Sequence, residues 1–279
     1  MNKRKSDPVY RVAKQLVKQA LPDDQTLSPT NKQTVHKLRV LSKQLRALLQ
    51  IYRPDLDTEV IKPLEKQLQG FAKDYASLRD NIVMQETLDM LLQRFALDDQ
   101  AEAQLLREYF AQRPKAVAET TPDNPVERLE LILKQWKKSL HLQGSDDFTR
   151  GIEYSYQKAR KLAKKAQSTD LDDNYHECRK WVKYLLYQID LLAGDLHKAK
   201  KRYQRQLKKL AGELGVLHDH CVLEQHLADI LIQSQQQEQL CSAATLGLNW
   251  VKEQKARDKE ICQALFIEVF PAADCPVIA

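Results

Sequence analysis

A row of one histidine followed by two cations occurs twice in this chain, with the same spacing and 140 residues apart. The first copy is His36, Arg39 and Lys43, and the second is His176, Arg179 and Lys183. A shorter echo follows each copy, since Leu-Arg-Asp-Asn-Ile-Val at 78–83 matches Leu-His-Asp-His-Cys-Val at 217–222. Two matches at nearly one offset indicate an internal duplication. We therefore expect two related halves, each with a row and then an Arg-Asp or His-Asp turn.

The first row extends in both directions on a predicted helix. At about 100° per residue, its members fall within a band roughly 80° wide. They are Lys32, His36, Arg39, Lys43 and Arg46. No Asp or Glu occurs between residues 32 and 46. A solvated helix face usually mixes charges, because opposite charges four residues apart stabilise the helix. The missing acids therefore favour a positive binding site over an ordinary solvated face.

Glycine is rare in this chain, with 7 residues in 279. Few stretches show the period of two that strands require, and good helix formers are abundant, which together predict an all-α fold. Signals for helix starts and ends predict helices at about 8–22, 29–53, 58–78, 81–95, 99–113, 125–142, 148–166, 172–193, 195–214, 219–235 and 238–270.

Three local signals shape this division of the chain. Asp80 and Asp219 precede helical periodicity, and we expect each to cap the helix that follows, or to orient a neighbouring cation. Gly215 is expected to break the basic helix before Asp219. Residues 114–125 contain three prolines and are predicted to link a first half (8–113) to a second half (126–270) within one domain.

The formal net charge of +6 is moderate, but the charges are unevenly placed. Residues 32–46, 156–165 and 197–209 contain Lys and Arg without any acid, while acids collect elsewhere, as at 170–177. Segregation of this kind predicts a positively charged site on a surface of mixed charge. A specific polyanionic ligand is therefore favoured over nonspecific binding.

The five cysteines form an odd set without a Cys-x-x-Cys pair, which fits a reducing compartment and argues against structural zinc. The first residues are basic but lack an apolar core, so no signal peptide is expected. No apolar run approaches the roughly 18 residues that span a bilayer. The sequence therefore predicts a soluble cytoplasmic protein without membrane contact, and nothing in it requires a cofactor or a metal.

Four motifs follow one another in a fixed order along the chain. They are Val35-His36-x-x-Arg39-x-x-x-Lys43-x-x-Arg46, Leu78-Arg79-Asp80-x-x-Val83, His176-x-x-Arg179-Lys180-x-x-Lys183 followed by Tyr187-Gln188, and Leu214-Gly215-x-x-His218-Asp219-x-x-Val222-Leu223. Tyr156-x-x-x-Arg160 precedes the second row. In their order, duplication and separation, these motifs resemble the CHAD domain, the conserved-histidine α-helical domain, over about residues 8–265.

The resemblance implies a helical bundle of two pseudo-symmetric halves around a basic central cavity. It further implies a non-catalytic, cytoplasmic protein that binds inorganic polyphosphate, at polyphosphate granules; phosphate or sulfate ions would suit the same cavity. Carried over position by position, the binding residues would be His36, Arg39, Lys43, Arg46, Arg79, Tyr156, Arg160, His176, Arg179, Lys183 and His218, supported by Lys32, Asp80, Asp219 and Lys208. Gln44, Leu186 and Ala76 depart from the family's pattern, so we expect fewer charges in the second row.

The residue types suit such a ligand. Polyphosphate carries roughly one negative charge per unit, and a strip of cations gains affinity from the release of condensed counterions, as argued for nucleic acids. Arg offers a planar fork to phosphate oxygens, and Lys offers a compact charge. Because neighbouring cations keep His36 and His176 neutral until an anion arrives, we expect tighter binding at mildly acid pH.

Two other functions are open on this sequence. His218-Asp219 resembles the doublet of a metal-dependent phosphohydrolase, with His176 and Asp229 as further ligands, but the aligned doublet in the first half is Arg79-Asp80, and Arg is not a metal ligand. A nucleic-acid-binding protein is disfavoured, because the rows lack interleaved aromatic residues for base stacking. The plainer alternatives are solvated basic faces, structural histidines and a helical scaffold, with Trp136, Trp181 and Trp250 in its core.

Overall fold

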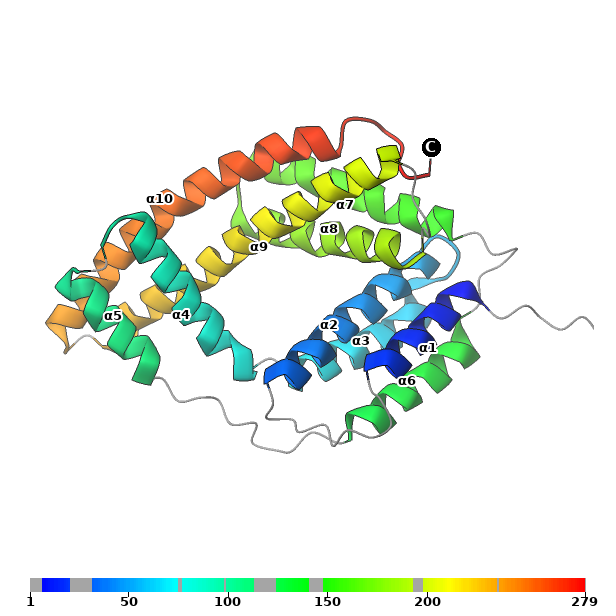
Figure 1. Cartoon of the computed structure of the whole chain (residues 1–279), viewed down its shortest axis with the longest axis horizontal. Coiled ribbons are helices and arrows are strands. Elements are labelled where there is room, and N and C mark those ends of the chain that lie inside the picture. Colours follow the sequence, from blue (N-terminus) through cyan, green and yellow to red (C-terminus); the bar gives the residue numbers. More distant parts are fainter. Residues whose placement is uncertain are drawn as a thin grey trace, which may run out of the picture.

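The chain is helical throughout the part that the structure describes (Figure 1). This computed structural model describes residues 7–20, 32–74, 77–97, 99–112, 124–140, 148–192, 198–234 and 236–278, except for the side chains at 32, 77–82 and 198–199. Its helices are α1 (Pro8–Ala20), α2 (Lys32–Leu49), the 3₁₀ helix η1 (Gln50–Tyr52), α3 (Thr58–Asp74), α4 (Ser77–Arg94), α5 (Ala101–Gln112), α6 (Pro125–Ser139), α7 (Thr149–Thr169), α8 (Asp172–Leu192), α9 (Lys198–Gln233) and α10 (Glu238–Val269). No strand occurs in these segments, and the all-α prediction is confirmed.

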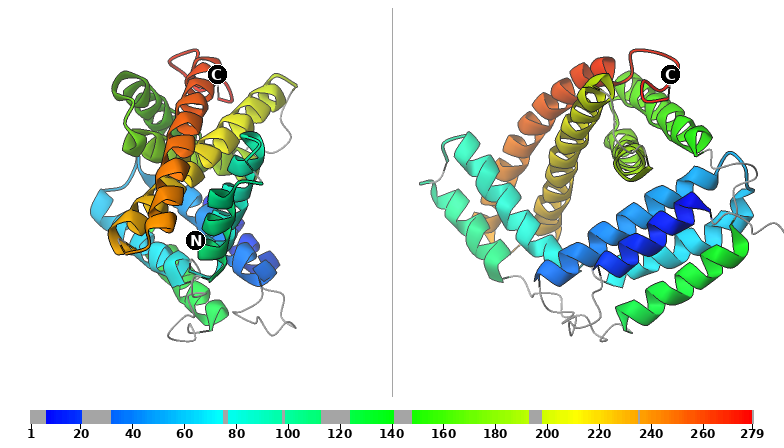
Figure 2. Two further views of the ribbon diagram at one scale, coloured as in Figure 1. Left: turned by 90° about the vertical axis from the view of Figure 1, so that its left-hand side faces the viewer. Right: turned by 45° about the vertical axis from the view of Figure 1, so that its right-hand side comes forward.

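The helices pack around two hydrophobic cores. The larger core joins α1, α2, α3, α6, α7 and α8 to the first half of α9 and the end of α10. The smaller core joins α4 and α5 to the second half of α9 and the first half of α10, at one end of the molecule (Figures 1 and 2). Each core thus contains helices from both sides of the predicted linker at 114–125. Most of that linker lies outside the described residues, and the domain limits stay a prediction.

The long helix α9 connects the two cores. It continues without interruption for 36 residues, so the predicted break at Gly215 and the predicted N-cap at Asp219 are wrong. A glycine inside a helix costs about 1 kcal/mol relative to alanine. The neighbouring Leu214 and Leu217 are almost completely buried, and each contributes about 1.5–3 kcal/mol through burial, which outweighs that cost.

The helix α4 also differs from the prediction at its start. It begins three residues before Asp80, so Asp80 lies in the first turn and is not the N-cap. The Arg-Asp and His-Asp pairs of the two halves are therefore both helical, and neither lies in a turn.

Two other helices, α1 and α6, begin with a side-chain cap. The Asp7 carboxylate accepts the backbone N–H groups of Val9 and Tyr10 at 2.9 and 3.2 Å, at the start of α1. It also accepts a 2.8 Å hydrogen bond from the Tyr52 hydroxyl, which ties α1 to η1. Before α6, the Asn124 side chain accepts the N–H of Val126 at 3.0 Å. Both caps satisfy donors that have no partner within the helix.

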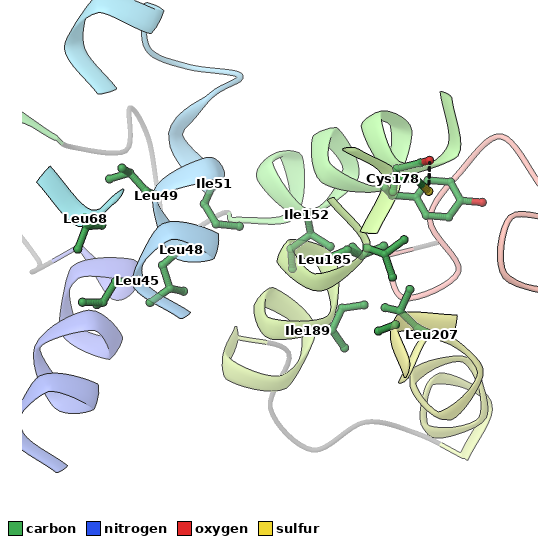
Figure 3. Packing of buried hydrophobic residues seen from close by; sticks show 14 of the residues in the cluster. Leu45, Leu48, Leu49, Ile51, Leu68, Ile152, Cys178, Leu185, Ile189 and Leu207 are labelled. Atoms are coloured by element: carbon green, nitrogen blue, oxygen red, sulfur yellow. Dashed lines mark hydrogen bonds between the residues drawn. The ribbon is translucent and has the colours of Figure 1, made fainter. Parts of the chain in front are cut away.

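The two helices that carry the cationic rows are direct neighbours. Buried leucines near the end of α2 face the apolar side of α7 and α8, as Figure 3 shows for Leu48, Ile152 and Leu185. Within this contact, the buried amide of Gln188 on α8 donates a 2.7 Å hydrogen bond to the carbonyl of Ala47 on α2. A buried amide that keeps its partner also fixes the register of the two helices.

The tryptophans are placed only partly as predicted. Trp136 is completely buried and donates a 3.1 Å hydrogen bond to the Tyr52 hydroxyl oxygen. Trp181 and Trp250 are half-buried at the edges of the two cores. Among the described helices, none combines the length and the apolar character that crossing a bilayer would require.

Candidate functional site: a histidine pair among cations

Two of the predicted histidines meet between α8 and α9. Nδ1 of His176 lies 3.1 Å from Nδ1 of His218, and the ring centroids are 4.7 Å apart. A contact of this kind needs one donor and one acceptor, so at least one of the two rings is neutral at Nδ1. When both rings are neutral, one presents an Nε2–H donor and the other an Nε2 acceptor. Uptake of one proton turns the pair into two outward donors.

Burial and nearby cations keep this pair neutral. The pKa of His218 is lowered to about 3, mainly by burial. The further causes are the charges of Arg179, His176, Lys183 and Lys43. Burial and then Arg179 also lower the pKa of His176. A bound anion would reverse the electrostatic part of these shifts.

The cations that act on His218 come from both copies of the row. Lys43 belongs to α2, whereas Arg179 and Lys183 belong to α8, two helices that are neighbours in the fold. Lys43 and Lys183 occupy equivalent positions in the two copies. The tertiary structure therefore places members of both rows around one histidine of α9.

Arg179 is half-buried, as are Lys43 and Lys183. Burial lowers its pKa, and the nearby carboxylate of Asp219 opposes that change. Its Nε atom is buried and has no hydrogen-bond partner within the described segments. A Cβ atom built at Gly215 would lie 4.0 Å from this Nε, so a larger side chain there would compete with the guanidinium. The charge of Asp219 thus acts on Arg179, while its orienting role, the alternative to a cap, stays a prediction.

The row on α2 continues to Arg46, close to α8. The Arg46 guanidinium lies 5.9 Å from the ring centroid of Tyr184, within the range of a cation–π contact. Its Nε is likewise buried and lacks a hydrogen-bond partner in the described part of the chain. Three predicted arginines, Arg46, Arg160 and Arg179, therefore retain a buried Nε donor that a phosphate oxygen could accept.

The other predicted residues differ in their exposure to solvent. His36 is exposed, Arg39 is half-buried, and Lys208 is exposed on α9. The side chains of Lys32, Arg79 and Asp80 lie outside the described residues, so their predicted roles stay predictions.

Tyr156 does not join this group. Its side chain is completely buried, its hydroxyl donates a 2.8 Å hydrogen bond to the carbonyl of Ala272, and its ring lies 5.5 Å from that of Phe270. The side chain therefore serves the contact between α7 and the segment after α10, because its face of α7 turns toward the core. Arg160 lies close enough to lower the pKa of Tyr156 in part, although burial raises that pKa to about 12. Neither residue is brought to the histidine pair in any contact described here.

The sequence reasoning missed His220, two residues after His218. His220 is 5% exposed, and its Nδ1 lies 2.6 Å from the carboxylate of Asp258 on α10. The same carboxylate accepts a 2.6 Å hydrogen bond from the Gln254 amide. No local signal separates His220 from His218, because the partner that defines its role is 38 residues away.

A second buried polar contact was also not predicted. The ammonium group of Lys255, a residue that is 7% exposed, donates hydrogen bonds to Asp172 on α8 and to Glu224 on α9. Burial alone would lower the pKa of Lys255, but the hydrogen bonds to the two carboxylates raise it. This lysine joins the two helices that carry His176 and His218.

The alternative based on a metal needs His and Asp ligands that converge on one point. Among the described residues, no three His, Cys, Asp or Glu side chains are close enough to hold a metal ion. Asp229 instead pairs with His226 at 3.8 Å. The described side chains therefore do not fit the phosphohydrolase site that His218-Asp219 suggested.

No curated protein matches this chain. A solved structure, the crystal structure of the CHAD domain from the plant Ricinus communis, is similar with a TM-score of 0.58 at 20% identity, over 92% of this chain and 87% of that one. At this identity the likeness concerns the fold. The family model of the CHAD domain matches residues 11–228, more than half of the sequence, so the chain belongs to the CHAD domain family.

Proposed function

We propose that this protein binds inorganic polyphosphate, without catalysis, in a basic central cavity lined by the two cationic rows. One observation supports this most directly: cations from both rows lower the pKa of the same residue, His218. These cations are Lys43, Arg179 and Lys183. Membership of the CHAD family supports a polyphosphate-related role. Association with polyphosphate granules in the cytoplasm is part of the same proposal.

The chemistry of binding follows from these groups. A flexible anion gains affinity when several fixed cations displace its counterions. Arg46 and Arg179 hold buried Nε donors for which the described residues offer no acceptor, so a phosphate oxygen would satisfy them instead. Rigid helices keep the cations in place, which reduces the ordering cost of binding.

The histidine pair would add a proton-linked component. Since the pair is neutral without a ligand, it does not add to the repulsion among the cations. A bound phosphate chain favours uptake of a proton, after which both rings donate to the anion. The pair therefore stabilises the bound state more than the unbound state, and this difference increases as the pH falls toward 6.

A titration with polyphosphates of defined length, by calorimetry at several salt concentrations, tests the proposal. We expect the double variant Arg39→Ala/Arg179→Ala to bind at least about 100-fold more weakly at low salt, because each lost charge-assisted hydrogen bond costs about 1.5–3 kcal/mol. The slope of log affinity against log salt should also fall by about 1.5, as two phosphate contacts are lost.

The control variant is Lys134→Ala/Lys137→Ala, which removes the same charge from the exposed surface of α6. It should bind almost as the parent does. Because the Nε atom of Arg179 is buried, Lys43→Gln/Lys183→Gln provides a second test that leaves the guanidinium groups in place. Parent-like affinity in both row variants, with helicity retained, would exclude the rows as the site; release of phosphate with a stoichiometric metal would contradict binding without catalysis.

A further inference from the structure

A pocket of about 390 Å³ lies between the start of α8 and the middle of α9. This size falls within the roughly 300–1,000 Å³ range of small-molecule sites, near its lower end. Leu214, Leu217 and Val222 of α9 and the ring of Tyr175 of α8 form apolar walls. The first turn of α8 and the next turns of α9 complete the lining with polar groups.

These walls do not suit a phosphate chain. Among the described residues, no Lys or Arg lines the pocket, and the acids Asp172 and Asp173 belong to its lining. Asp172 is engaged by Lys255 and Lys259, whereas Asp173 is exposed. The pocket therefore offers apolar surface together with acceptors of hydrogen bonds, which is the chemistry of a flat, uncharged ring system with amino groups.

The histidine pair belongs both to the pocket and to the group of cations from the two rows. His176 and His218 belong to the pocket lining, and the same His218 is within the electrostatic influence of Arg179, Lys183 and Lys43. Along α8, Arg179 and Lys183 follow His176 by three and seven residues, which is about 4.5 and 10.5 Å of helix rise. A short phosphate chain attached to a group in the pocket would reach both.

We propose that this pocket holds the base of a purine nucleoside oligophosphate whose phosphates lie on the cations beyond the histidine pair. This rests on the proposed function, since it uses the same cations. The Asp173 carboxylate and the Gln225 amide, both exposed, supply an acceptor and an amide for the amino groups and ring nitrogens of a purine. The apolar walls supply the contact with its faces.

The experiment compares ATP and GTP with inorganic tripolyphosphate on the full chain, by calorimetry at one salt concentration. We expect the nucleotides to bind at least about tenfold more tightly, because the base buries apolar surface in addition to the phosphate contacts. Equal affinities for nucleotide and tripolyphosphate would overturn the proposal. If neither nucleotide nor polyphosphate binds, the proposed function fails as well.

Two matched variants of α9 locate the effect. Val222→Phe fills the pocket and should remove the advantage of the nucleotides while leaving the affinity for tripolyphosphate unchanged. Val216→Phe adds the same bulk at an exposed position that does not line the pocket, and should change neither affinity. Asp173→Ala, which is far less disruptive to the core, should also reduce nucleotide binding alone. A nucleotide advantage that survives both Val222→Phe and Asp173→Ala would place the base elsewhere and refute the assignment.

Discussion

His218 and His220 lie two residues apart on α9, about 200° apart around the helix, and their surroundings differ completely. His218 faces His176 and is surrounded by cations from both rows. His220 is buried between α9 and α10, where a carboxylate holds it at 2.6 Å. One side of α9 thus lies near positive charges. On the other side, the buried carboxylate of Asp258 contacts His220 and accepts a hydrogen bond from Gln254.

The two sides show what separates a binding site from a structural contact in this molecule. Around His220, the carboxylate of Asp258 has partners from both α9 and α10, as expected for buried polar groups in a stable core. Near His218, the Nε donor of Arg179 remains buried without an acceptor in the described segments. A set of donors with too few acceptors is costly unless a ligand supplies them, so the cost itself indicates an anion.

The largest effect, a loss of stability, is expected when the contact between His220 and Asp258 is removed. Asp258→Ala removes the partner of a buried histidine and of the Gln254 amide. Loss of one member of such a pair costs about 3–5 kcal/mol, so the free energy of unfolding should fall by that amount in denaturant titrations. Polyphosphate affinity of the folded protein should stay close to that of the parent.

The control for this variant is Glu260→Ala, which removes an exposed carboxylate from the same helix. Its effect on stability should stay within about 0.5 kcal/mol. If Asp258→Ala were as stable as this control, the contact between His220 and Asp258 would not be structural, and the contrast drawn between the two histidines would be lost.

An intermediate effect is expected on the affinity for polyphosphate when His218 is replaced. In the parent, affinity for polyphosphate should rise as the pH falls from 8 to 6, because the histidine pair takes up a proton when the anion binds. His218→Gln should bind about tenfold more weakly at pH 6 and show almost no dependence on pH, while its stability changes little. Titrations at three pH values measure both effects; affinity that is flat in the parent would contradict the role given to the pair.

The smallest effect concerns stability as a function of pH. The pKa of His218 is about 3 in the folded protein, below the ordinary histidine value of about 6.5 expected in the unfolded chain. Between these values the unfolded chain binds a proton that the folded chain does not, so stability falls as the pH decreases through this range. Because the side chain is partly exposed, solvent screening limits the loss to less than about 1 kcal/mol.

Parallel denaturant titrations of the parent and of His218→Gln from pH 7 to pH 5 measure this loss. The variant should lose less stability than the parent over that interval. Identical slopes would mean that His218 is as easily protonated in the folded protein as in the unfolded chain, and that the cations do not act on it.

Several features of the site were open to prediction because they depend on local pattern. The spacing of His36, Arg39 and Lys43, its repetition on α8, and the absence of acids between residues 32 and 46 are properties of the sequence itself. The caps at Asp7 and Asn124 depend on neighbours two or three residues away, and both are present. Tyr156 was assigned by its place in a motif, and only the packing of the segment after α10 showed that it is buried.

The sequence by itself determined that the chain is helical, that it carries two cationic rows, and that His176 and His218 belong with them. The helices and the two rows, with His176, follow from side-chain periodicity and charge, which act over a few residues. His218 was assigned through the resemblance to the CHAD family. The tertiary structure alone decided that α9 continues through Gly215, that Lys43 and Lys183 act on one histidine, and that His220 is structural. Each of these depends on burial and on partners far away in the sequence, whose free energies exceed local preferences of about 1 kcal/mol.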